Sequence, residues 1–393
     1  MMLVHLVAGS VAAAARPILP YAWSFTAGLP AGVTFTRPGT DTAIQTVRNA
    51  SGYVATLTGD TYGVDHSLSN VPLGLRAEGA RTNVWSHSEE ITNADNWGQA
   101  ATTRTLDATT GPDNTLSGDK VAHNSTSNNQ SRITENMSLS VYSEGDTYAI
   151  SGWWKETGQG NNDWICFRLG SHEAVDPHVF FNIGASPGLG SNTDPARGFV
   201  EDWGNGWRRL KWRSSYNADS DGVERVQFTL QAADQGAGSV VSYAGVVGEG
   251  QFFYGMQKER LVDFASSYIP TAGASVTRNP TLAVADFALT WPAKLRIKGR
   301  TAPGIGTVEG DQVFLALTNR NSGLIEVYRR AFDRKLILAH GSKVYDLGVV
   351  GDGTDFDLTQ ALDGAPGVDR AYFGSNAIGG QHWFGTIHTV ELA

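Results

Sequence analysis

The sequence predicts an all-β protein made of tandem β-sandwich (jelly-roll) domains that follow a short N-terminal arm. Composition is the first reason: 46 of the 393 residues are glycine, only 18% are charged and 41% are hydrophobic. That balance favours packed cores joined by tight turns over long charged helices. Pattern is the second reason, because short apolar runs alternate with clusters of Gly, Asn, Asp and Ser. The length is enough for two or three domains.

Residues 1–22 form an apolar, alanine-rich arm in which Pro17 and Pro20 exclude a continuous helix. A signal peptide is one interpretation, because residues 12–15 resemble a small-residue cleavage region. The basic n-region is missing, however, since no Lys or Arg precedes Arg16. The run is also too short to span a bilayer. We favour an arm that docks on a partner protein.

Residues 23–73 are expected to form a small β region that attaches the following domains to that partner. Phe25, Val33 and Phe35 alternate with small or polar residues, as in short strands with one buried face. The run Asn-Ala-Ser-Gly at 49–52 is a turn signal.

Residues 74–278 carry the clearest strand pattern and are expected to form the first sandwich. Bulky apolar residues mixed with polar ones predict strands with one buried face, and Gly/Asn/Asp clusters separate them. The strands are expected over 147–155, 164–169, 179–183, 207–212 and 226–230.

Residues 279–393 are expected to form the second sandwich, with a boundary near Arg278 and Pro280. The run at 379–387 is similar to the closing strand of concanavalin- and laminin-G-like sandwiches. Further short strands are expected over 289–291, 294–297, 312–317, 324–328 and 335–338.

The formal net charge of −9 argues against duplex nucleic acid and anionic membrane surfaces as partners, and leaves neutral glycans open. The single cysteine, Cys166, lies in an apolar run and is expected to be a buried thiol. One cysteine makes no internal disulfide and no cysteine-based zinc site. Stability must therefore come from packed cores and oligomer contacts.

Several short motifs in the sequence identify a protein family more specifically than the composition does. They are EGARTN at 78–83, SGWWK at 151–155, GWRR at 206–209, GMQKE at 255–259 and SSYIPT at 266–271. Together they resemble the β-sandwich module of phage virion fibre and head-spike proteins, or of phage-like gene-transfer particles, across about residues 24–278.

This resemblance implies a carbohydrate-binding-module-like sandwich over 74–278 and a concanavalin/laminin-G-like sandwich over 279–393. It also implies a virion location, a docking role for the arm and contact with host-surface glycans. Most motif residues are expected to be scaffold: Trp207 belongs to a core, and Glu259 pairs with Arg278 or Arg81.

No catalytic motif emerges, and the sequence predicts a protein that is not an enzyme. A glycosidase needs two carboxyl groups that face one bond, but Glu89 and Glu90 are adjacent and would face opposite ways on a strand. The sequence contains no H-E-x-x-H motif.

Calcium is the one cofactor that the sequence leaves open. Asp352, Asp355 and Asp357 offer oxygen ligands, although the run lacks a full calcium-binding loop. The run at 171–178 contains two histidines and two acidic residues and is read as a solvated loop.

Glycan-binding candidates are tryptophans with polar, turn-like neighbours, because sugars stack on aromatic rings and hydrogen-bond to flanking amides and carboxylates. Three places fit this description. They are Trp164 with Asn162 and Asp163, Trp203 with Asp202 and Asn205, and His382 with Trp383.

The function that follows is multivalent attachment of a virion fibre or spike to host cell-surface polysaccharide. Oligomerisation, as a trimer or a vertex pentamer, would raise avidity above the affinity of one site. Two alternatives remain open. One is a purely structural decoration or adaptor subunit, and the other is a capsule-polysaccharide depolymerase.

Overall fold

The computed structural model describes residues 21–392 except 38–43, 94–96, 136–145, 159–162, 170–177, 192, 194, 196, 216–225, 235–241, 263, 287–292, 302–311, 319–324, 330–333, 341–342, 351–354, 363–369 and 374–384. All regular structure in these residues is β-strand, which confirms the predicted all-β class. No helix in them has the length and apolarity that crossing a membrane requires. Residues 1–20 of the predicted N-terminal arm lie outside the described residues.

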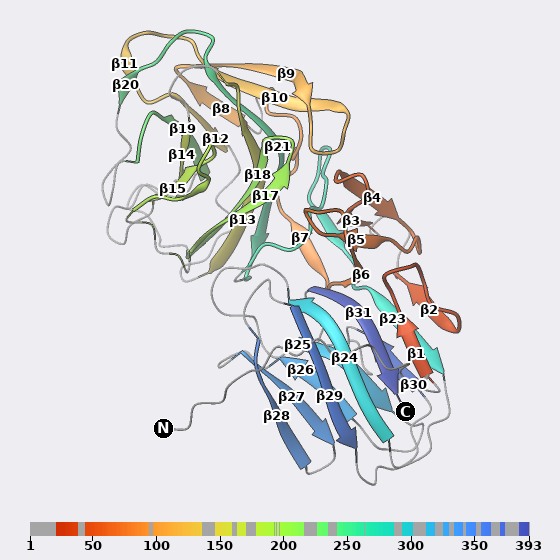
Figure 1. Cartoon of the computed structure of the whole chain (residues 1–393). Coiled ribbons are helices and arrows are strands. Elements are labelled where there is room, and N and C mark those ends of the chain that lie inside the picture. The colour runs from red at the N-terminus through yellow and green to blue at the C-terminus, as the bar shows by residue number, and fades with distance from the viewer. Residues whose placement is uncertain are drawn as a thin grey trace, which may run out of the picture.

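The first sandwich occupies the upper part of Figure 1 and is built from residues 97–260. One sheet contains, in spatial order, β17 (Gly198–Gly204), β18 (Trp207–Ser215), β13 (Thr147–Glu156), β21 (Gly250–Arg260), β10 (Leu116–His123) and β9 (Thr102–Thr110). The other contains β16 (Gly188–Leu189), β15 (His178–Asn182), β14 (Trp164–Leu169), β19 (Val226–Gln231), β12 (Arg132–Glu135) and β8 (Trp97–Ala100). A short ribbon joins β11 (Asn128–Asn129) to β20 (Tyr243–Ala244).

The core of this sandwich is aromatic. Trp154 from one sheet contacts Phe167 and Phe228 from the other, with ring centroids 4.8 and 5.4 Å apart. Cys166 is fully buried, as expected. The alternation of β-strand side chains sends Trp154 inward and its neighbour Trp153 to the opposite face of the same sheet. That opposite face meets the rest of the molecule.

The second sandwich, lower in Figure 1, draws strands from both ends of the chain. One sheet contains β29 (Asp355–Leu362), β24 (Ala293–Thr301), β31 (Gly385–Leu392), β6 (Pro72–Ala77) and β5 (Val64–His66), and β1 (Tyr21–Ser24) also pairs with β31. The other contains β2 (Val33–Thr36), β23 (Leu282–Asp286), β30 (Arg370–Phe373), β25 (Gln312–Thr318), β26 (Ile325–Arg329), β27 (Lys335–His340) and β28 (Lys343–Val349).

This pairing differs from the predicted division of the chain at 22/23, 73/74 and 278/279. Tyr21 pairs with Leu392, and β2 pairs with β23, so residues 23–73 are not a separate unit in the strand pairing. Phe25 and Phe35 belong to the same core as Phe373. The physical reason is that local alternation predicts a strand but not its partner, and these partners stand at opposite ends of the sequence.

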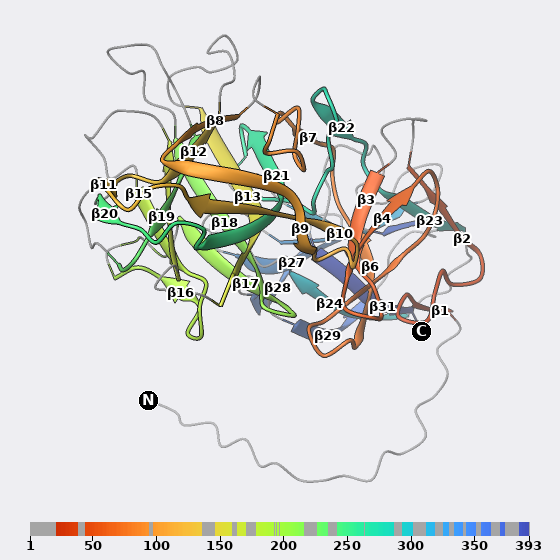
Figure 2. The ribbon, with the colours of Figure 1, turned by 90° about the horizontal axis from the view of Figure 1, so that it is seen from above.

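Two small ribbons lie between the sandwiches. β7 (Arg81–Asn83) pairs with β22 (Val276–Arg278), and β3 (Ile44–Arg48) pairs with β4 (Val54–Thr58). In Figure 2 the second ribbon lies beside the turn that joins β9 to β10, where Val54 N donates to Pro112 O at 2.8 Å. The first sandwich is therefore inserted into the second and held to it by these segments.

A buried polar cluster, made by the motifs 78–83, 255–259 and 266–271 with Arg278, lies at this junction. Arg278 is 0% and Glu78 2% exposed, and Arg278 Nη1 lies 3.0 Å from Glu78 Oε2. Ser267 N donates to Glu78 Oε1 at 2.8 Å. Arg81 Nε lies 3.8 Å from Glu259 Oε1, so the Arg81 alternative of the predicted Glu259 pair is the one that forms.

Asn83 shows why the EGARTN motif is scaffold. Its Nδ2 donates to Met256 O at 3.1 Å and to Ile269 O at 2.8 Å. Its Oδ1 accepts from Trp85 N at 3.1 Å and from Lys258 N at 3.0 Å. The motif therefore ties β7 to β21 and to the SSYIPT segment, and the motif residues stabilise the junction.

Candidate functional site

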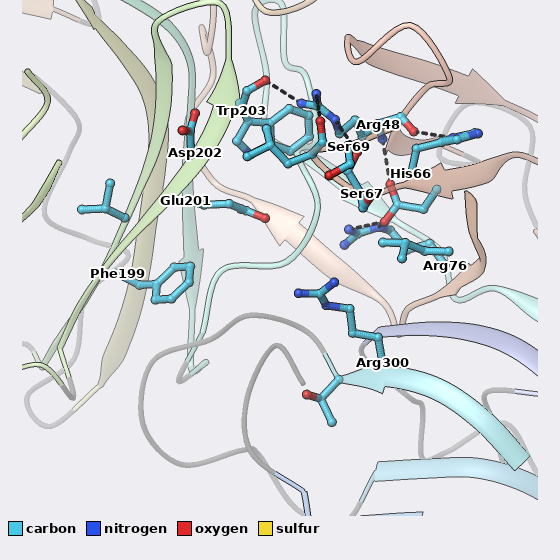
Figure 3. A pocket seen from close by; sticks show the side chains of 15 residues that line it. Arg48, His66, Ser67, Ser69, Arg76, Phe199, Glu201, Asp202, Trp203 and Arg300 are labelled. Carbon is cyan, nitrogen blue, oxygen red and sulfur yellow. Dashed lines mark hydrogen bonds and ion pairs between the residues drawn. The ribbon is translucent and has the colours of Figure 1, made fainter. Parts of the chain in front are cut away.

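A cleft of about 410 Å³ opens at the junction of the two sandwiches. Figure 3 shows its walls: β17 of the first sandwich on one side, and β3, β5 and β6 with the loop at 67–69 on the other. The end of β24 adds Arg300 and Thr301 from the second sandwich. The lining therefore comes from three stretches that are far apart in the sequence.

Strand alternation explains how β17 lines the cleft. Phe199, Glu201 and Trp203 are spaced by two residues, so their side chains project on one side of the strand. The turn that follows β17 contains Asn205 in the left-handed region, at φ 55°, between two glycines that also have positive φ. This tight turn returns the chain to β18, whose pairing fixes β17 at the edge of the sheet.

Trp203 is partly buried and anchored on two sides. Its ring meets the Trp153 ring edge-on, at 5.3 Å between centroids and 83° between planes. The Arg48 guanidinium lies 5.6 Å from the Trp203 ring centroid. Trp203 is therefore a rigid, half-exposed ring at the cleft edge rather than an isolated surface platform.

Arg48 ties the two walls together. Its Nη1 donates to Trp203 O at 2.5 Å, and its Nε donates to Ser67 O at 3.1 Å. The side chain is 8% exposed, and burial lowers its pKa, although Asp65 opposes that shift. Charge-assisted hydrogen bonds from one guanidinium thus connect β17 to the loop after β5.

Glu201 is the acceptor on the β17 wall. Its Oε2 lies 3.1 Å from Lys211 Nζ, and its side chain is 24% exposed. Burial opposes ionisation of Glu201, but the positive charges of Lys211 and Arg209 outweigh burial and lower its pKa to about 2. Burial also lowers the pKa of Lys211 to about 8, against the attraction of Glu201. At neutral pH Glu201 is therefore a carboxylate.

Asp65 and Arg76 form the matching pair on the opposite wall. Arg76 donates to Asp65 Oδ2 from Nε at 3.0 Å and from Nη2 at 2.6 Å. Burial lowers the pKa of Arg76, but Asp65 and Glu78 outweigh burial and raise it. Arg76 also lies 3.7 Å from Glu78, which connects the cleft to the buried polar cluster.

The structure brings one of the three predicted glycan-binding groups into the cleft. Trp203 and Asp202 line it, and Asp202 is exposed and pairs with Arg208 at 2.9 Å. Asn205 is exposed at the neighbouring turn but does not line the cleft.

The second predicted group lies elsewhere. Trp164 begins β14, is partly buried and does not line the cleft; its carbonyl accepts from Gln251 Nε2 at 2.9 Å. The carboxyl group of its neighbour Asp163 shares a hydrogen bond with that of Glu156, whose pKa is raised by burial and by Asp163. Asn162 lies outside the described residues, and so do both members of the third group, His382 and Trp383.

The described part of the chain offers no support for the calcium candidate. Asp357 accepts two hydrogen bonds from Arg296, at 2.7 and 2.5 Å, which neutralises its charge. Asp355 is exposed, and Asp352 lies outside the described residues. Among the residues with a described position, no three His, Cys, Asp or Glu side chains gather to hold a metal ion.

Most residues of the cleft lining were not predicted from the sequence, and four of them show why. A signal for Phe199 and Glu201 was present in the sequence, because they are spaced by two residues from Trp203, which was predicted as a glycan-binding residue. Arg48 and Arg300 had none, because they reach the cleft only through the pairing of distant strands.

Comparison with known proteins adds little to this geometry. No protein-family model matches the chain, and no curated protein matches it. Among solved structures, the N-terminal CBM22-1-CBM22-2 tandem domain from Paenibacillus barcinonensis Xyn10C is similar at 11% identity and a TM-score of 0.28. That alignment covers 81% of this chain and 99% of the other. The functional argument therefore rests on the cleft itself.

Proposed function

We propose that the cleft binds a saccharide and that the protein is a carbohydrate-binding attachment protein. One observation carries the proposal: β17 presents Phe199, Glu201 and Trp203 on one side, into a cleft of about 410 Å³. Ligand sites of this size are common for small molecules and short oligosaccharides.

The lining has the two chemistries that sugar recognition needs. The Trp203 and Phe199 rings offer apolar surface to the C–H face of a sugar ring. The Glu201 carboxylate accepts hydrogen bonds from hydroxyl groups, and the Ser67 and Ser69 side chains both donate and accept them. Rigid support from Arg48 and Trp153 lowers the entropy cost of binding.

Binding, rather than catalysis, suits these carboxyl groups. A glycosidase needs a protonated carboxyl group at its working pH. The pKa of Glu201 is about 2, so this group has no proton to donate at neutral pH. Asp65 and Asp202 are both held in ion pairs. A role as a depolymerase is therefore the less favoured function.

The finer proposal is attachment of a virion fibre or spike to host-surface polysaccharide, with the protein acting as a homo-oligomer. Its support is the resemblance of the 78–83, 255–259 and 266–271 motifs to phage spike modules. A single cleft of this size would bind weakly, and several copies on one particle would supply the avidity that adsorption needs.

Replacing Trp203 by alanine is expected to weaken saccharide binding by about five- to thirtyfold, because an aromatic stacking surface worth about 1–2 kcal/mol is lost. The measurement is a glycan array with the full chain, followed by calorimetric titration of the best ligand. Trp164→Ala is the matched control, since it removes a partly buried tryptophan outside the cleft.

Loss of binding in Trp164→Ala alone would assign the saccharide site to the first sandwich around Trp164 and not to the cleft. A folded protein that binds no glycan would favour the structural adaptor, and shortened polysaccharide products would favour the depolymerase.

A further inference from the structure

We infer that Lys211 is a positioning residue of the saccharide site, whose charged ammonium group holds the Glu201 carboxylate and the Phe199 ring in place without touching the saccharide. This inference rests on the proposed function and deepens it, because it makes binding depend on a charge outside the cleft. Lys211 is 4% exposed and does not belong to the cleft lining. The two side chains that it supports do, and Figure 3 shows both on the β17 wall.

The register of β17 and β18 explains how Lys211 reaches both side chains. Lys211 is paired with Phe199, and Arg209 is paired with Glu201. Long side chains on one face of an antiparallel pair reach both the residue directly opposite and its diagonal neighbour. Lys211 Nζ accordingly lies 5.8 Å from the Phe199 ring centroid and 3.1 Å from Glu201 Oε2. One ammonium group thus contacts the stacking surface and the hydrogen-bonding group of the same wall.

Both contacts depend on the positive charge of Lys211. A cation is attracted to the face of an aromatic ring, and an ammonium group is attracted to a carboxylate. A neutral amine loses both attractions. The other cations near Glu201 already serve other acceptors, because Arg209 donates to Ser266 O at 2.7 Å and Arg76 donates to Asp65. Loss of the Lys211 charge therefore loosens Glu201 and Phe199.

Lys211 is placed where it loses this charge just above neutral pH. Burial lowers its pKa to about 8; Arg209 and Arg76 act in the same direction, and Glu201 opposes them. In the described part of the chain, these are the charged side chains that act on Lys211, and they come from β18, β6 and β17. Its partner on β13, Ser151, is uncharged. The ammonium group is therefore populated below the pKa and is lost as the pH rises through it.

The first test is the affinity of the full chain between pH 6 and pH 9, measured by calorimetric titration. The probes are maltohexaose, cellohexaose and mannohexaose, which have no group that titrates in this range, and the best ligand from the glycan array. We expect a constant affinity from pH 6 to pH 7 and a fall of about two- to tenfold by pH 9. This is the factor that immobilising one loosened side chain costs on binding.

Lys211→Arg is the decisive variant. It is expected to keep its pH 7 affinity up to pH 9, because a guanidinium stays charged over the whole range. Lys211→Met is expected to bind about two- to tenfold more weakly than the wild type at pH 7 and to show no further fall. If the larger arginine prevents folding, the flat profile of Lys211→Met decides. A merely structural role for Lys211 would leave the pH profile of these variants like that of the wild type.

Lys155→Met is the matched control. Lys155 lies on the neighbouring strand β13, outside the cleft lining, and its Nζ lies 5.9 Å from the centroid of the Trp207 ring. This variant removes the same charge from a similar aromatic contact and is expected to keep the wild-type profile. Near-ultraviolet circular dichroism at each pH checks that all variants are folded.

The outcomes separate the role of Lys211 from the existence of the site. A wild-type affinity that stays constant to pH 9, or a fall that persists in a folded Lys211→Arg, overturns the inference. So does a profile that Lys155→Met changes as much as the Lys211 variants do. The saccharide site survives each of these results if Trp203→Ala still weakens binding. Absence of binding to the three hexasaccharides and to every glycan on the array overturns both.

Discussion

Arg278→Met is expected to lower the free energy of unfolding by about 3–5 kcal/mol, because it removes one partner of a buried ion pair. Arg278 and Glu78 are 0% and 2% exposed, and Ser267 hydrogen-bonds to both. Methionine fills the space but leaves the Glu78 carboxylate without its nearest cation. The remaining one, Arg76, lies 3.7 Å away and already binds Asp65. Urea denaturation followed by tryptophan fluorescence measures the change.

Arg296→Met is the matched control for this prediction. It breaks the pair with Asp357, whose side chains are 19% and 40% exposed. Because solvent screens such pairs, the expected loss is below about 1 kcal/mol. Equal losses in the two variants would contradict the view that the buried cluster holds the junction together.

The same pair makes a testable statement about pH. Burial opposes ionisation of Glu78, but Arg278 and Arg76 outweigh burial and lower its pKa below the ordinary 4.5. A folded-state pKa below the unfolded one gives stability that is present above pH 4.5 and lost as the pH falls through the folded value. The difference in unfolding free energy between the wild type and Arg278→Met should therefore shrink as the pH falls below 4.5.

The strands of the fold could be predicted well from the sequence, because bulky apolar residues between turn clusters identify them locally. Strands expected over 147–155 and 164–169 appear as β13 (Thr147–Glu156) and β14 (Trp164–Leu169). The expected strand over 335–338 is the start of β27 (Lys335–His340). The side-chain period and the turn residues are local properties, so a single sequence is enough to identify them.

The pairing of strands could not be predicted in the same way. Nothing in the residues around Tyr21 indicates Leu392 as the partner, since the choice depends on which distant surfaces exclude water together. The same dependence on distant strand pairing limits the prediction of the candidate site. Trp203 was found because an aromatic residue in a polar turn is a local signal, whereas Arg48 and Arg300 become neighbours of Trp203 only after both sandwiches have formed.

Asp119 is expected to make the protein less stable as the pH rises from about 4 to about 7. It is 1% exposed, and burial raises its pKa from 3.8 to about 7 even though the Asp107 amide donates to it at 2.9 Å. In that window the folded state holds a proton that the unfolded state has released, so stability falls with rising pH and levels off above it. The interval, 7 − 3.8, is about three pH units and corresponds to about 4 kcal/mol.

Asp119→Asn should flatten this decline, because the amide stays neutral at every pH in the window. Asp107→Asn is the matched control: Asp107 is exposed, its φ of 50° suits asparagine, and its backbone amide still reaches Asp119. Unfolding free energies at pH 5, 6, 7 and 8 should therefore fall for the wild type and the control but not for Asp119→Asn. A decline that survives in Asp119→Asn would assign the proton to another group, with Glu89 the first to examine, because burial raises its pKa as well.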